Sequence, residues 1–313
     1  MSDRRPDELP ASARVEEAAE GVLRITIPLA LRSPDHINCY VLRLPAGDLL
    51  VDTGMRGSEP ALRAGLRRAG ADPQRVLVTH GHIDHWGLAT RFTDTVLAHP
   101  GCRSSFAFAE DTEQDAELPG AAGMLGRAEL ERAFARYRSM VAGVPDREDL
   151  ADGDEIDGWR VLWTPGHAPG HVCLLREADG LLLAGDHLLP GFTPNVQPSP
   201  QGRDALDDFL TSLDRMQELD VSLVLPAHGE PYRDAVGRAA ELRLHHEERL
   251  QRLEDALAAG PRPLRTLTDE IFGDVVHRED RMLADMETYA HLEYLRLRER
   301  ARRDDSGVWA SAA

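Results

Sequence analysis

Four side chains of the kinds that bind metal ions occur within six residues of this chain, directly after the apolar run Val76-Leu77-Val78. The segment reads His80-Gly81-His82-Ile83-Asp84-His85. Imidazole and carboxylate groups suit zinc, iron and manganese. Three histidines and one aspartate this close together cannot all face one tetrahedral ion, so the segment favours two metal ions over one. It holds no cysteine, unlike many closed structural zinc sites. We therefore predict a hydrolytic or oxidative metal site at the end of a buried strand.

Three later segments share one design, in which an apolar strand leads through a tight turn to a metal-type residue. They end in Pro165-Gly166-His167, Gly185-Asp186 and Pro226-Ala227-His228. A glycine or proline beside each polar residue suits a sharp exit from a sheet with close backbone approach. One such histidine alone is more often an ordinary packed or surface residue. Together with the first segment, the three predict one shared site.

Short apolar segments recur along residues 21–232, with helical patterns between them at 59–70 and 204–219. This alternation fits a layered α/β arrangement. From about residue 104 to 144 the apolar residues take helical spacings, which predicts a helical insert that forms a lid, a dimer contact or a packing element. Strands are expected at residues 22–28, 37–44, 48–52, 75–79, 96–99, 159–164, 171–176, 181–184 and 221–225.

Beyond Tyr232 the pattern becomes helical, with long amphipathic runs at 234–259 and 280–302. We expect residues 233–313 to form a C-terminal helical subdomain whose last residues, 304–313, are frayed. Residues 1–20 are polar and charged and are expected to form a tail. The chain would then consist of this tail, a catalytic domain over 21–232 and the helical subdomain.

The charge balance narrows the possible partners. A formal net charge of −18 argues against general nucleic-acid binding, because a phosphate backbone would be repelled. Three cysteines scattered over 313 residues do not form a disulfide framework. Residues 1–20 lack an apolar signal segment, and no run approaches the roughly 18 apolar residues that span a bilayer. We expect a cytoplasmic protein without a membrane partner, either monomeric or a homodimer.

The complete ordered set of residues resembles the ligand set of the metallo-β-lactamase superfamily over about Val22 to Tyr232. The resemblance implies an αββα sandwich with two metal ions at one edge of the facing sheets. It also implies a division of the ligands into two groups that share a bridging residue. These are His80, His82 and His167 on one metal, Asp84, His85 and His228 on the other, and Asp186 between them.

Within that superfamily the sequence departs from the class-B antibiotic hydrolases, which lack a bridging aspartate of the Gly185-Asp186 type. It looks closer to the glyoxalase II, lactonase and thioesterase-like branch. The long helical tail after Pro226-Ala227-His228-Gly229 is also similar to the β-lactamase-like protein 2 group, which includes an RNA hydrolase. Asp52-Thr53-Gly54 matches a superfamily turn whose aspartate hydrogen-bonds the loops that carry the ligands.

The leading hypothesis is a dinuclear metal-dependent hydrolase that attacks a small ester, thioester or lactone with a metal-bridging hydroxide. Two zinc ions are expected, with iron or manganese possible, and Asp84 is the preferred candidate for moving a proton. His36, His171 and His187 are candidates for substrate binding or for orienting a ligand. One alternative is a mononuclear iron oxygenase of the persulfide dioxygenase type. Another is an RNA-cleaving nuclease, suggested by the arginine-rich run over residues 296–303.

Overall fold

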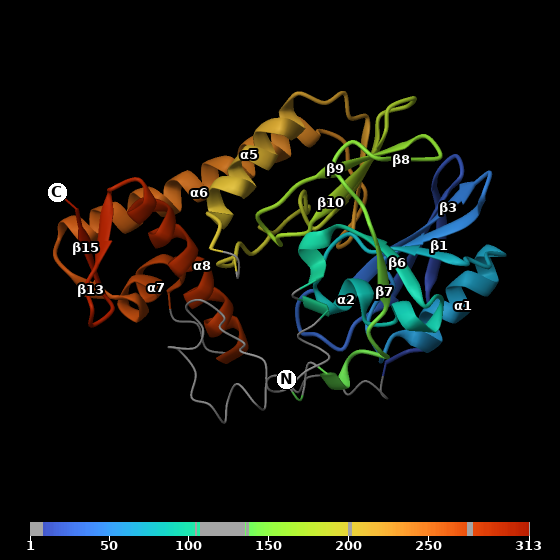
Figure 1. Ribbon diagram of the computed structural model, residues 1–313, viewed down its shortest axis with the longest axis horizontal. Coiled ribbons are helices and arrows are strands. Elements are labelled where there is room, and N and C mark those ends of the chain that lie inside the picture. The colour runs from blue at the N-terminus through green and yellow to red at the C-terminus, as the bar shows by residue number, and fades with distance from the viewer. Residues whose placement is uncertain are drawn as a thin grey trace.

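Two β-sheets of unequal size face each other in the computed structural model (Figure 1), which describes residues 9–103, 105–106, 135, 138–199, 202–273 and 278–312. The larger sheet has its seven strands in sequence order. Neighbouring strands are antiparallel from the first to the fourth strand and parallel from the fourth to the seventh. They are β1 (Arg14–Ala19), β2 (Val22–Pro28), β3 (His36–Leu44), β4 (Gly47–Val51), β5 (Arg75–Leu77), β6 (Thr95–Ala98) and β7 (Asp146–Asp149).

Helix α1 (Glu59–Ala69) makes the crossover between the parallel strands β4 and β5. It ends at Gly70, whose φ of +58° suits a left-handed helix cap. A short helix, α2 (Ile83–Trp86), follows β5, and two 3-10 turns, η2 (Ala89–Arg91) and η3 (Pro100–Cys102), flank β6.

The smaller sheet has the order β12-β11-β10-β9-β8. Its strands are antiparallel except for the β11–β12 pair, which is joined by helix α5 (Ala205–Gln217). The strands are β8 (Glu155–Ile156), β9 (Trp159–Trp163), β10 (Val172–Arg176), β11 (Leu181–Gly185) and β12 (Leu223–Pro226).

Alternation along each strand divides the apolar side chains between the inside and the outside of this pair of sheets. On β10, Leu174 packs in the core between the sheets, together with Leu42 of β3 and Leu77 of β5. Its neighbour Cys173 points to the opposite face and packs in the core that contains Phe209 of α5. The larger sheet buries its other face against α1. The fold is therefore the expected αββα sandwich of two sheets between helical layers.

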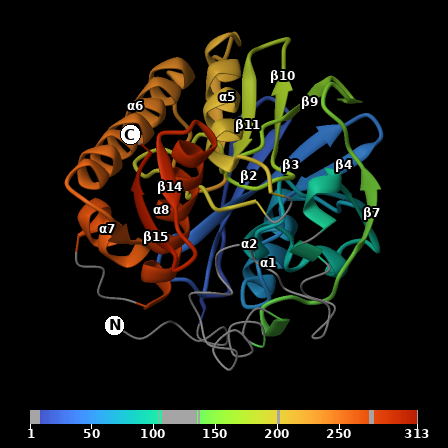
Figure 2. The same ribbon diagram turned by 60° about the vertical axis from the view of Figure 1, so that its left-hand side comes forward.

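The C-terminal part packs onto this sandwich through the α5 side. It consists of α6 (Ala235–Ala258), α7 (Leu264–Phe272) and α8 (Arg278–Leu297), with a small sheet of β13 (Arg262–Pro263), β14 (Ala301–Arg303) and β15 (Val308–Ser311). α5 and α6 lie side by side, and α7, α8 and the small sheet lie beyond them (Figures 1 and 2). One hydrophobic core runs from the smaller sheet through α5 and α6 to Trp309. The division into domains stays a prediction.

Two expectations about the chain ends were wrong. The polar tail becomes strand β1 from Arg14, because its backbone pairs with β2 and Glu16 forms an ion pair with the buried Arg24. The last residues are not frayed, because β15 pairs with both β13 and β14 and Trp309 is fully buried. α8 consequently ends at Leu297, five residues before the expected helix end.

Most of the expected helical insert over residues 104–144 lies outside the described residues. Among the described ones, Phe106 is buried and its ring lies 4.7 Å from that of Trp86. In the part of the chain that the structure describes, no helix has the length and apolar character needed to cross a membrane.

Candidate metal centre

The candidate residues come from one edge of the two sheets. The first segment follows the carboxyl end of β5, and the others follow the ends of β9, β11 and β12. Backbone hydrogen bonds join these loops: Val172 N donates to Thr79 O at 2.8 Å, and Ala227 N donates to Gly185 O at 2.9 Å. The indole of the buried Trp86 donates to Gly81 O at 3.0 Å and so closes the loop over residues 80–85.

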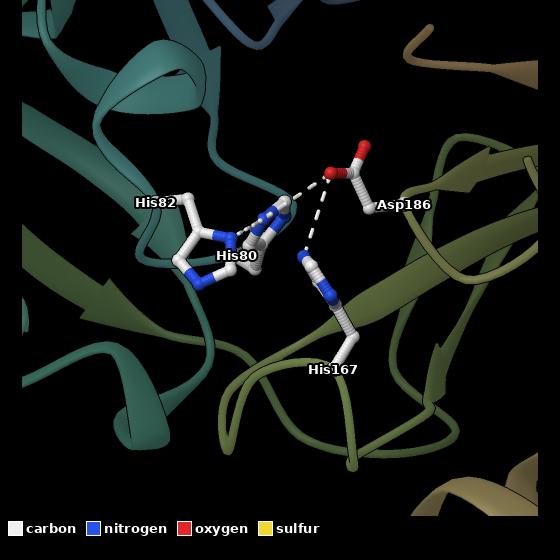
Figure 3. A group of neighbouring side chains, drawn as sticks. All are labelled: His80, His82, His167 and Asp186. Atoms are coloured by element: carbon white, nitrogen blue, oxygen red, sulfur yellow. Dashed lines mark hydrogen bonds and ion pairs between the residues drawn. The ribbon is translucent and has the colours of Figure 1, made fainter. Parts of the chain in front are cut away.

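The first group consists of His80, His82, His167 and Asp186, whose ligand-type atoms all lie within 4.8 Å of one another. Figure 3 shows these side chains turned toward a common space between the loops. His80 Nε2 lies 2.9 Å from His82 Nδ1, and His167 Nε2 lies 3.4 Å from Asp186 Oδ2. The same carboxylate oxygen lies 3.9 Å from His80 Nε2.

The second group consists of Asp84, His85 and His228. His228 Nε2 lies 3.4 Å from Asp84 Oδ2 and 3.4 Å from Asp186 Oδ1. His85 Nε2 lies 3.6 Å from Asp186 Oδ1. One oxygen of Asp186 therefore faces the first group and the other faces the second. This arrangement suits a carboxylate that bridges two metal ions.

Hydrogen bonds to residues outside the two groups determine which ring nitrogen of His167 and of His228 carries the proton. His167 Nδ1 lies 2.7 Å from Asn195 O, and His228 Nδ1 lies 2.7 Å from His36 O. A carbonyl can only accept, so both Nδ1 atoms carry the proton and both Nε2 atoms present a lone pair. These two Nε2 atoms, with His85 Nε2 and Asp186 Oδ1, are buried without a hydrogen-bond partner among the described residues. Unpaired buried acceptors are costly, and two divalent metal ions would satisfy this set.

The electrostatics of these residues also suit metal binding. Burial lowers the pKa of His82 to about 3 and holds the pKa of His80 well below its usual value, so both rings stay neutral. Burial alone would raise the pKa of Asp84, but His85 and His228 outweigh it and lower that pKa to about 2. Burial alone would lower the pKa of His228, yet Asp186 and Asp84 raise it. Neutral imidazoles and ionised carboxylates are the forms that bind metals, and the second group attracts positive charge.

Asp52 belongs to neither group but holds the ring of His85 and the backbone of Thr79 in place. Its Oδ2 lies 2.7 Å from His85 Nδ1, and its Oδ1 accepts from Thr79 N at 2.8 Å. Its φ of +60° is uncommon for a residue other than glycine. The Asp52-Thr53-Gly54 turn indicated this role from the sequence. Asn195, the partner of His167, carried no such signal.

The three histidines expected near the site differ in what they contact. His171 Nε2 accepts from Asp186 N at 3.0 Å, and its Nδ1 lies 2.7 Å from Thr164 Oγ1, so it holds the backbone of Asp186. That contact needs Gly185, because a Cβ there would lie 2.6 Å from His171 Nε2. His36 Nε2 accepts from Gly229 N at 3.1 Å, next to His228. His187 is fully buried with its ring against Phe209, and neither of its nitrogens has a hydrogen-bond partner among the described residues. Binding of substrate by any of the three stays a prediction.

A third buried group, which the sequence did not single out, lies between α6 and α8. His291 Nδ1 donates to Glu287 O at 2.7 Å, so its Nε2 accepts from His246 Nδ1 at 3.0 Å. The Glu287 carboxylate binds Arg249 and accepts from Asn195 Nδ2. Because an arginine already neutralises this carboxylate, the group fits a hydrogen-bond network better than a metal site.

Comparison with known proteins agrees with this geometry. The family model of the metallo-β-lactamase superfamily matches residues 32–228. A probable metallo-hydrolase of Bacillus subtilis (strain 168) is 30% identical over 309 residues, which cover 90% of this chain and 93% of that protein.

Two solved structures resemble the whole chain. A metallo-β-lactamase family protein from Thermus thermophilus has 31% identity and a TM-score of 0.82, with 94% of this chain and 100% of that chain covered. A β-lactamase domain protein from Burkholderia ambifaria has 32% identity and a TM-score of 0.84, with 97% and 96% covered. Both likenesses extend through the C-terminal helices. Matched in sequence over most of its length and in fold over nearly all of it, the chain belongs to the metallo-β-lactamase superfamily.

Proposed function

We propose that this protein is a dinuclear metal-dependent hydrolase that opens a small ester, thioester or lactone. The cofactors are two zinc ions, or iron or manganese in their place, and the substrate is a small molecule. The observation that carries the proposal is the position of Asp186, whose two oxygens face two separate groups of histidines. The metallo-hydrolase name of the Bacillus subtilis relative points to the same class of reaction.

Two metal ions held by these groups would lower the pKa of bound water and supply a hydroxide near neutral pH. The protein's own carboxylates divide the remaining work. Asp186 directs both of its oxygens at histidines, whereas both contacts of Asp84 with His85 and His228 use Oδ2. Asp84 is therefore the carboxylate with an oxygen left to accept a proton from the nucleophile.

The cysteines do not provide an alternative nucleophile. All three are buried, and burial raises the pKa of Cys102 to about 12 and that of Cys173 to about 12. Burial likewise raises the pKa of Cys39 well above its usual value. A thiol that stays protonated at neutral pH is a poor nucleophile.

The arginine-rich run at the end of α8 does not favour RNA as the substrate. Arg298 Nη1 donates to Asp204 Oδ2 at 2.6 Å, and Arg300 Nε donates to Glu254 Oε1 at 2.7 Å. Arg296 pairs with Glu293. Arginines already paired with carboxylates offer little charge to a phosphate backbone, and the net charge of −18 opposes its approach.

A substrate screen on the zinc-loaded protein tests the proposal. It covers acyl thioesters, lactones, β-lactams and phosphodiesters, with single-stranded RNA at low salt. We expect turnover of a thioester, ester or lactone, abolished in Asp84→Ala and kept in Asp94→Ala, a change at an exposed site just before the amino end of β6.

Metal analysis of protein purified without added metal is the companion measurement. Two metal ions per chain are expected. One iron and no zinc, with oxygen consumption on a persulfide, would contradict the hydrolase and favour the oxygenase. Cleavage of RNA without turnover of any acyl substrate would favour the nuclease.

A further inference from the structure

We infer that the C-terminal helices act as a positioning element for the first metal group, through a chain of contacts from Arg249 and Glu287 to Asn195 and from Asn195 to His167. This inference rests on the proposed metal centre. It assigns a role in metal binding to residues that lie on α6 and α8, outside the segments that carry the ligands.

The chain of contacts begins at His167, whose ring is held from the side opposite to Asp186. His167 Nδ1 donates to Asn195 O at 2.7 Å, which directs the Nε2 lone pair toward Asp186 Oδ2. A partner that fixes the second nitrogen of a ligating histidine sets both its tautomer and its ring orientation. The position of the Asn195 carbonyl therefore decides where the metal-facing atom of His167 lies.

Asn195 in turn is fixed by α8. Its Nδ2 donates to Glu287 Oε2 at 2.7 Å and lies 3.3 Å from Leu283 O. Glu287 is only 4% exposed, and its other carboxylate oxygen binds the Arg249 guanidinium of α6. When Glu287 is ionised, its hydrogen bond from Asn195 is stronger than one between neutral groups. The amide of Asn195 is thus anchored directly to α8 and, through Glu287, to α6.

The same helices hold the neighbouring backbone. Arg238 of α6 donates from Nε to Leu189 O at 2.8 Å and from Nη2 to Phe192 O at 2.8 Å. These carbonyls and Asn195 belong to the segment over residues 187–199, which directly follows Asp186. Three of its residues are therefore tied to α6 or α8.

The two metal groups differ in this dependence. In the second group, His85 is oriented by Asp52 and His228 by the carbonyl of His36, all within the sandwich. Only His167 of the first group is oriented by a residue that the C-terminal helices hold. A change that loosens Asn195 should consequently weaken metal binding at the first group and leave binding at the second group unchanged.

The test measures metal affinity, with zinc titrated against a chromophoric chelator. In a His228→Ala background, which leaves the first group intact, Asn195→Ala should weaken zinc binding by about tenfold. In a His82→Ala background, which leaves the second group intact, the same change should have no effect. Asn195→Ala retains the backbone carbonyl, so an effect can arise only through positioning.

Variants of α8 give matched controls. Glu287→Ala should reproduce the loss, and Asp285→Ala should not, although both carboxylates are buried on one helix and pair with an arginine. Glu287→Gln should rescue binding in part, because its amide oxygen still accepts from Asn195. If Glu287→Ala does not fold, Asn195→Ala decides the question. Unchanged first-group affinity, or equal weakening of both groups, would overturn the inference. A wild-type protein that binds no metal would instead contradict the proposed function.

Discussion

Asp52 connects the backbone of one ligand loop to the ring of His85, although it belongs to neither metal group. It accepts from Thr79 N and lies 2.7 Å from His85 Nδ1. Burial alone would lower the pKa of His85, but Asp52, Asp186 and Asp84 raise it well above its usual value. A carboxylate at Nδ1 favours positive charge at Nε2, either a proton or a metal ion, and fixes the orientation of the ring.

Asp52→Asn should therefore weaken metal binding at the second group by about 10- to 100-fold. If the asparagine oxygen keeps its bond to Thr79 N, its amide hydrogens face His85 Nδ1, and the ring loses the acceptor that set its tautomer. Metal titration in a His82→Ala background measures this directly. Asp48→Asn, four residues earlier on β4 and paired with Arg43, is the control. Equal affinities in all three proteins would show that Asp52 does not orient His85.

At the scale of elements, the turn from β9 to His167 passes very close to α5. Gly166 has a φ of +130°, and a Cβ there would lie 2.4 Å from Phe209 Cα. Gly153 also has a positive φ, +87°, but a Cβ there would meet nothing within 4 Å. Substitution of each glycine by alanine thus distinguishes the cost of backbone strain from the cost of a steric clash.

Gly166→Ala should lower the free energy of unfolding by about 3 kcal/mol or more, because the clash adds to the strain. Gly153→Ala should cost only the strain, about 1–2 kcal/mol. Urea unfolding of the metal-free variants measures both values. Equal losses would mean that α5 gives way to the new methyl group.

The interface between α6 and α8 depends on two histidines that stay neutral. Burial lowers the pKa of His291 to about 3 and that of His246 well below its usual value. The charged or titratable groups around them are Arg249, His245 and Glu287. Because the folded pKa of His291 lies below its unfolded value, its contribution to stability is complete above about pH 6.5 and is lost as the pH falls toward 3. Burial raises the pKa of Glu287 to about 7, so its protonation acts in the opposite direction.

A comparison of wild type with His291→Gln isolates the histidine, since the contributions of other groups largely cancel. The wild-type advantage in unfolding free energy should shrink by about 2 kcal/mol between pH 7 and pH 5. Urea unfolding of metal-free protein at both pH values provides the measurement. An advantage that stays constant would mean that His291 is not buried as a neutral ring.

At the scale of the whole molecule, the sequence predicted the features that depend on the order of apolar and polar residues within a short segment. Apolar runs that end in Gly185-Asp186 or Pro226-Ala227-His228 indicate both a strand and the polar residue at its end. The two-sheet sandwich and the polar residues at its edge could therefore be predicted from the sequence. Strand β1 was missed because its residues, such as Glu16, are polar and are stabilised by pairing with β2. Strand β15 was missed because the burial of Trp309 depends on distant partners.

The residues that orient the candidate ligands could not be predicted from short sequence segments either. Asn195 and Glu287 are 92 residues apart, and nothing near Asn195 in the sequence marks it as the partner of His167. Such contacts exist only after the C-terminal helices pack onto the α5 side of the sandwich. Candidate ligands at strand ends can therefore be predicted from the sequence, whereas the residues that orient them become visible only in the folded chain.

The central claim is that Asp186 lies between two metal ions, and anomalous diffraction from zinc-soaked crystals at the zinc absorption edge tests it most directly. We predict two anomalous peaks per chain, one beside Asp186 Oδ2 among His80, His82 and His167, and one beside Asp186 Oδ1 among Asp84, His85 and His228. A single peak at full zinc occupancy, or two peaks that leave Asp186 outside the pair, would contradict the dinuclear account.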